Sequence, residues 1–130
     1  MIVTDSSALI AALIDEGAAG ESVRRRLSED GDLHAPHLLD LEVISVVRRW
    51  VQQGRLSEER GTFALEELAD LVVARYPHWP LRSRIWELRG NLSVYDAAYI
   101  ALAETIGCPL LTGDRRLAGA PGIACDVEVV

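Results

Sequence analysis

Short apolar runs alternate along the chain with longer segments whose apolar residues recur every three or four positions. The short runs are typical of buried strands, and the periodic segments are typical of helices that cover a sheet. We expect strands at 2–4, 33–35, 110–112 and 124–129. We expect helices at 8–14, 18–28, 38–53, 57–76, 81–89 and 93–106.

This order of elements predicts one α/β domain over residues 1–130, with a parallel sheet covered on both sides by helices. Gly54 is expected to end the helix at 38–53, and the next helix then runs back beside it as an antiparallel helical arm. Ser6 or Ser7 is expected to cap the helix at 8–14.

Composition narrows the possible functions. The net charge is −7, which argues against a generally positive nucleic-acid-binding surface and leaves only local contacts to phosphates. All 13 basic residues are arginines, so mechanisms that need a lysine amine are excluded. The two cysteines, Cys108 and Cys125, lack partners at metal-ligand spacing and are interpreted as buried thiols.

The sequence contains neither a basic segment followed by an apolar leader nor an apolar run long enough to span a membrane. We therefore expect a cytoplasmic protein.

Four acidic residues occupy positions that bring them to one edge of such a sheet. Asp5 and Asp114 each follow a predicted strand, and Glu42 and Asp96 lie in the opening turns of very apolar helices. Ligands of open α/β sheets bind at the carboxyl ends of the strands. Each pair of carboxylates at 4 Å would cost ~4 kcal/mol at an effective dielectric near 20. Oxygen ligands without histidine or cysteine favour Mg²⁺ or Mn²⁺ as the compensating cation.

Taken singly, each acid also has a structural interpretation. Asp5 is a candidate helix cap, Ser93-x-x-Asp96 resembles a capping box, Glu42 suits a solvated helix face, and Asp114 is placed to cap a turn. The metal site is predicted from the four acids together.

The motifs Asp5-Ser6-Ser7, Glu42, Ser93-x-x-Asp96-Ala97 and Thr112-Gly113-Asp114 resemble those of the PIN domain, and most closely those of VapC toxins of bacterial toxin–antitoxin pairs. The resemblance implies a three-layer α/β/α PIN-like fold with a short parallel central sheet. It also implies an endoribonuclease in which Asp5, Glu42, Asp96 and Asp114 are catalytic and bind one or two Mg²⁺ or Mn²⁺ ions. Metal-activated water would hydrolyse the RNA to leave 5′-phosphate and 3′-hydroxyl ends.

The resemblance implies supporting roles for two hydroxyl side chains, those of Thr112 and Ser6. Arg115 and Arg116 replace a further acid that some relatives carry, and they are candidates for phosphate binding or for a solvated turn.

The partners implied are RNA, a VapB-type antitoxin that wraps the helical arm, and a second copy in a homodimer. DNA would be contacted only through the antitoxin. Two interpretations stay open for Trp50, Trp79 and Trp86, which suit either partner contacts or core packing.

Two other functions compete with the toxin. One is a PIN nuclease of RNA processing, and the other is a binding module that keeps the fold without catalysis.

Overall fold

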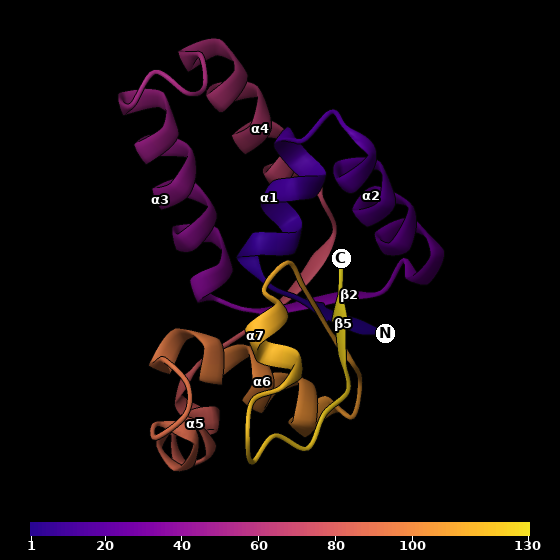
Figure 1. Ribbon diagram of the computed structural model, residues 1–130, viewed down its shortest axis with the longest axis vertical. Coiled ribbons are helices and arrows are strands. Elements are labelled where there is room, and N and C mark those ends of the chain that lie inside the picture. Colours follow the sequence, from indigo (N-terminus) through magenta and orange to yellow (C-terminus); the bar gives the residue numbers. More distant parts are fainter.

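The computed structural model describes residues 1–130 as a five-stranded sheet with helices on both faces (Figure 1). The first half contains β1 (Ile2–Thr4), α1 (Ser6–Ile14), α2 (Ala18–Asp30), β2 (Leu33–Pro36), α3 (Leu38–Gln52) and α4 (Glu58–Asp70). The second half contains β3 (Val73–Tyr76), the 3-10 helix η1 (Trp79–Leu81), α5 (Arg82–Leu88), α6 (Val94–Ile106), β4 (Leu110–Thr112), α7 (Arg115–Ala118) and β5 (Val127–Val129).

All strands run parallel, in the order β3-β2-β1-β4-β5. The strand β1 is central. The next two strands along the chain, β2 and β3, lie on one side of it, and β4 and β5 lie on the other. The order therefore reverses between β1 and β4, where the loops diverge and leave a crevice at the carboxyl edge. Val3 pairs with Leu110 and Thr4 with Leu111, so the residues after Thr4 and Leu111 emerge side by side.

Helices cover the sheet as two layers. The helices α1 to α4 lie on one side of the strands and α5 with α6 on the other (Figure 1). The helix α6 packs against β1, β2 and β4, whereas α1 packs against β4 and α3 against β2. The predicted three-layer α/β/α architecture is confirmed. None of the helices is both long and apolar enough to cross a membrane.

One core of 28 buried residues unites the layers. The helix α6 is its densest part, because every residue from Ala97 to Ala103 is buried. This burial explains the nearly continuous apolar sequence of that helix. Of the two cysteines, Cys108 is buried, as predicted, and Cys125 is half-buried.

The prediction of one helix over 57–76 is wrong at its end. The helix α4 ends at Asp70, and Val73 to Tyr76 form the edge strand β3, which pairs with β2 over four residues. Val72, which the predicted helix would place on the same side as Leu65 and Leu68, is 85% exposed. Tertiary pairing with the open edge of β2 outweighs the local helical pattern here.

Smaller corrections concern element ends. Asp5, rather than Ser6 or Ser7, caps α1, with its side chain accepting a hydrogen bond from the Ala8 N–H. The last strand is shorter than the predicted 124–129, and the four-residue helix α7 was not predicted.

Truncating a core side chain of β4 tests this packing. Leu111→Ala should lower the free energy of unfolding by about 2–5 kcal/mol, because Leu111 is fully buried between the two helical layers. Leu41→Ala, the same substitution at a residue that is 71% exposed, should change it by no more than about 0.5 kcal/mol. Urea denaturation followed by circular dichroism measures both, and equal losses would contradict the assigned burial.

Candidate functional site

Asp5 leaves the end of β1 and is 5% exposed. Its Oδ1 accepts hydrogen bonds from the Ala8 N–H at 2.9 Å and the Ser7 hydroxyl at 2.7 Å. Its Oδ2 accepts one from the Thr112 hydroxyl at the end of β4. Donors from α1 and β4 thus fix both oxygens of one buried carboxylate.

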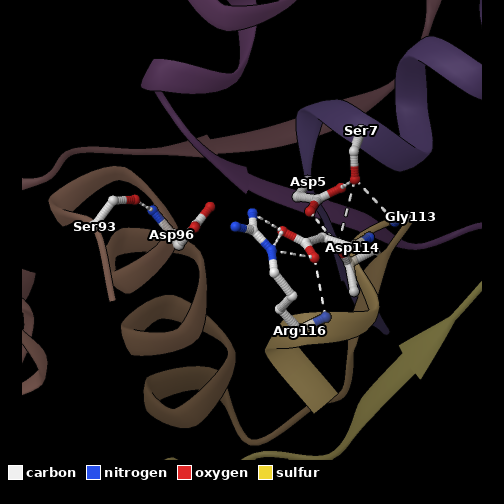
Figure 2. Close-up of polar contacts among 8 residues, drawn as sticks. Asp5, Ser7, Ser93, Asp96, Gly113, Asp114 and Arg116 are labelled. Carbon is white, nitrogen blue, oxygen red and sulfur yellow. Dashed lines mark hydrogen bonds and ion pairs between the residues drawn. The ribbon is translucent and has the colours of Figure 1, made fainter. Parts of the chain in front are cut away.

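Ser7 links the same two chain segments. Its Oγ accepts a hydrogen bond from the Gly113 N–H at 2.8 Å and lies 3.3 Å from the Thr112 Oγ1 (Figure 2). A Cβ atom at Gly113 would lie 3.2 Å from that Oγ, so glycine suits this close approach. Sequence reasoning assigned a supporting role to Ser6 and missed Ser7. Ser7 contacts Asp5, whereas Ser6 contacts Glu42.

Glu42, on α3, is held by the other serine and by α6. The Ser6 hydroxyl donates to Oε2 at 3.2 Å, and the Tyr99 hydroxyl donates to Oε1 at 2.9 Å. Tyr99 is only 1% exposed and was not predicted. The sequence contained one indication of this role. Tyr99 lies three residues after Asp96 and therefore shares its side of α6.

Asp96 and Asp114 begin helices on opposite sides of a pocket of about 510 Å³. The N-cap Ser93 accepts a hydrogen bond from the Asp96 N–H, which is one half of the capping box that Ser93-x-x-Asp96 resembles, and the Asp96 carboxylate makes no return bond to the Ser93 N–H. The Asp96 carboxylate points toward the guanidinium of Arg116 (Figure 2). The N-cap Asp114 accepts from Arg116 Nη2 at 2.6 Å and from Arg116 Nε at 3.0 Å.

The charges of three of these acids influence one another. Burial raises the pKa of Asp5, and the negative charge of Asp96 adds to that rise against the opposing hydrogen bonds. Burial likewise raises the pKa of Glu42, again with a contribution from Asp96. Arg116 instead lowers the pKa of Asp114 through their hydrogen bonds. Negative charge is therefore uncompensated at Asp5 and Glu42 and neutralised at Asp114.

The donors suit a hard divalent cation, because every candidate ligand is a carboxylate oxygen. No three acidic, histidine or cysteine side chains form a cluster tight enough to hold an ion in the arrangement seen here. In this arrangement Arg116 engages Asp114, and Tyr99 and Ser6 hold Glu42. Arg115, the neighbouring candidate for phosphate binding, is exposed.

A family model described as the PIN domain matches residues 2–123. The chain belongs to the PIN-domain family. Ribonuclease VapC9 of Mycobacterium tuberculosis is 46% identical over 130 residues, which cover 100% of this chain and 98% of that protein. The recognised resemblance to VapC-type proteins is thereby confirmed.

Solved structures agree with this PIN-domain fold. PAE2754 from Pyrobaculum aerophilum superposes with a TM-score of 0.73 at 23% identity, covering 98% of this chain and 83% of that one. VapBC2 from Rickettsia felis, bound to a promoter DNA fragment, gives a TM-score of 0.67 at 14% identity and covers 100% and 99%. At these identities the likeness establishes the shared fold of the PIN domain.

Removing the Ser7 hydroxyl tests the link between α1 and β4. Ser7→Ala should lower the free energy of unfolding by about 1–2 kcal/mol, because Asp5 loses a donor and the Gly113 N–H loses its acceptor. Ser28→Ala is the matched control, since its hydroxyl bonds only to the Arg25 carbonyl of the same helix. Urea denaturation should leave that variant within about 0.5 kcal/mol of the wild type. Similar values for both variants would contradict the link.

Proposed function

We propose that this PIN domain is a Mg²⁺- or Mn²⁺-dependent endoribonuclease and the toxin of a VapBC-type toxin–antitoxin pair. The observation that carries the proposal is the group of acids at the carboxyl edge of β1 and β4, in a chain 46% identical to a named VapC ribonuclease. We also propose that residues 1–130 form one domain, in keeping with their single core.

Asp5, Glu42, Asp96 and Asp114 are proposed to hold the metal, as one or two ions. A bound divalent ion would lower the pKa of a water molecule and neutralise charge on the scissile phosphate. The side chains around these acids would orient the carboxylate oxygens. Thr112 and Ser7 fix the Asp5 oxygens, and Ser6 with Tyr99 fixes those of Glu42.

Arginines beside the acids are proposed to bind the RNA backbone. Arg115 is exposed next to Asp114, and a guanidinium matches phosphate with two parallel hydrogen bonds. Arg116 is a second candidate, and its contact with Asp114 leaves it at the mouth of the pocket.

The proposed protein partners are a VapB-type antitoxin and a second copy of the chain in a cytoplasmic homodimer. The fold shared with the Rickettsia felis VapBC2 complex supports the antitoxin, which would provide the only contact with DNA. The helical arm of α3 and α4, which projects from the sheet, is the proposed antitoxin surface (Figure 1).

Cleavage of RNA with purified protein tests the metal ligands. Asp5→Asn and Asp96→Asn should each slow Mn²⁺-dependent cleavage by at least about 100-fold, and EDTA should abolish cleavage by the wild type. Asp70→Asn, at the exposed end of α4, is the control and should retain wild-type activity. Thermal unfolding confirms that each variant is folded. Cleavage that survives EDTA and both substitutions would refute the proposal.

Arg116 and the metal are predicted to compete for Asp114. Arg116→Gln should therefore tighten Mn²⁺ binding several-fold in the absence of RNA, as measured by isothermal titration calorimetry. Arg115→Gln removes a neighbouring charge that does not contact Asp114 and should leave the affinity nearly unchanged. Weaker Mn²⁺ binding by Arg116→Gln would show instead that the arginine maintains the site.

A further inference from the structure

A four-residue motif occurs twice in η1 and α5. Trp79-Pro80-Leu81-Arg82 and Trp86-Glu87-Leu88-Arg89 share the pattern Trp-x-Leu-Arg and lie seven residues apart. The first motif spans η1 and the start of α5, and the second spans the end of α5, so the likeness of the two rests on their burial and contacts. Leu81 and Leu88 are 5% and 3% exposed, so the leucine of each motif packs into the core.

The tryptophans of both motifs lie outside. Trp79 is 72% exposed and Trp86 is 64% exposed, which excludes core packing for these two. Trp50, by contrast, is half-buried and packs against the core. Two large exposed indoles seven residues apart are unusual on a surface and mark a contact site.

Each motif places its arginine over its own tryptophan. The Arg82 guanidinium lies 4.2 Å from the centre of the Trp79 ring, and Arg89 lies 4.2 Å from that of Trp86. Each arginine also donates a hydrogen bond to the carbonyl of the same tryptophan, at 2.9 Å and 2.7 Å. The two motifs thus adopt the same geometry, and each holds a cation against an exposed aromatic ring.

These two arginines contact no carboxylate. The other arginine of α5, Arg84, pairs with Glu104 of α6 and with Glu87, the acid inside the second motif. In a chain with a net charge of −7, two uncompensated guanidiniums beside exposed rings form a local positive surface. Such a surface complements phosphate, and the rings offer faces on which bases stack.

The two motifs precede the candidate active site along the chain. Immediately after α5, Asn91 and Leu92 line the 510 Å³ pocket that also contains Asp96 and Asp114. The same turn is joined to the far wall of the pocket by the hydrogen bond from Asn91 Nδ2 to the Pro121 carbonyl at 3.5 Å. RNA bound at Asp96 and Asp114 would therefore meet the segment that follows α5.

We propose that Trp79, Arg82, Trp86 and Arg89, the tryptophan–arginine platform, bind the unpaired bases and phosphates of single-stranded RNA that flank the cleaved bond. The inference rests on the proposed ribonuclease function and adds the substrate class, since bases stacked inside a duplex cannot reach the indoles. A second copy of the chain is the competing occupant. The exposed indole faces beside guanidiniums that contact no carboxylate favour RNA, because bases stack on the rings while the guanidiniums bind phosphate.

Binding in EDTA separates this inference from catalysis. A short fluorescein-labelled single-stranded oligoribonucleotide, titrated in a fluorescence anisotropy assay, should bind Trp79→Leu/Trp86→Leu roughly 10-fold or more weakly than the wild type. Arg82→Gln and Arg89→Gln should each reduce the slope of log affinity against log salt by about 0.7, the value for one phosphate contact in single strands. The tryptophan variant should keep the wild-type slope.

Arg55→Gln is the matched control, because Arg55 lies 4.8 Å above the Trp50 ring at the far end of the helical arm. It should bind the oligonucleotide as the wild type does, and a duplex of the same sequence should bind all variants equally. Light scattering after size exclusion measures the oligomeric state of each. Unchanged RNA affinity in the platform variants overturns the inference, and if their dimer is lost as well, the platform is a subunit contact.

Failure of the proposed function gives a different pattern. A wild type that never cleaves RNA but loses oligonucleotide affinity on platform substitution refutes the nuclease and retains the platform. A wild type that cleaves with Mn²⁺ while its platform variants bind normally retains the nuclease and refutes the platform.

Discussion

The burial of one carboxylate, that of Asp5, determines how the edge of the sheet is built. A buried charge without partners costs several kcal/mol, so its oxygens need donors in place. The Ala8 N–H and the Ser7 hydroxyl provide them from α1, and the Thr112 hydroxyl provides another from β4. Satisfying this single group therefore ties the first turn of α1 to the loop after β4. The crevice at the reversal of strand order owes its shape to this tie.

The central part of the fold was predictable from sequence, and the periphery was not. The strands β1, β2 and β4 are buried on both faces, so they are short and mostly apolar, which local pattern detects. The edge strand β3 is only partly buried and carries Arg75 within it, and its conformation follows from the open edge of β2. The helix α7 depends on Asp114 as its cap and spans only four residues, too few for a periodic signal.

For the site, the sequence identified the acids and two of the hydroxyls that hold them, those of Thr112 and Ser6, but not Ser7 or Tyr99. The positions of Asp5 and Asp114 follow from the rule that loops after parallel strands share an edge, which needs no side-chain detail. The partners of these acids depend on orientation. Ser6 and Ser7 are adjacent in sequence but differ by about 100° around the helix axis, so one reaches Glu42 and the other Asp5. Tyr99 reaches Glu42 across 57 residues, a separation that local pattern cannot bridge.

The chemistry of the donors also explains how a folded chain keeps a negative site. An arginine next to a buried acid would stabilise it by cancelling its charge, as Arg116 does at the more exposed Asp114. At Asp5 and Glu42 the donors are hydroxyls and a backbone N–H, which orient the oxygens without adding positive charge. Hydrogen bonding alone leaves burial as the dominant effect, so the pKa of both groups stays raised. Burying these carboxylates beside neutral donors lowers the stability of the metal-free protein. A divalent cation bound at this edge would offset that loss. The neutral donors therefore do two things at once: they orient the oxygens of Asp5 and Glu42, and they leave the negative charge there that a divalent cation would neutralise.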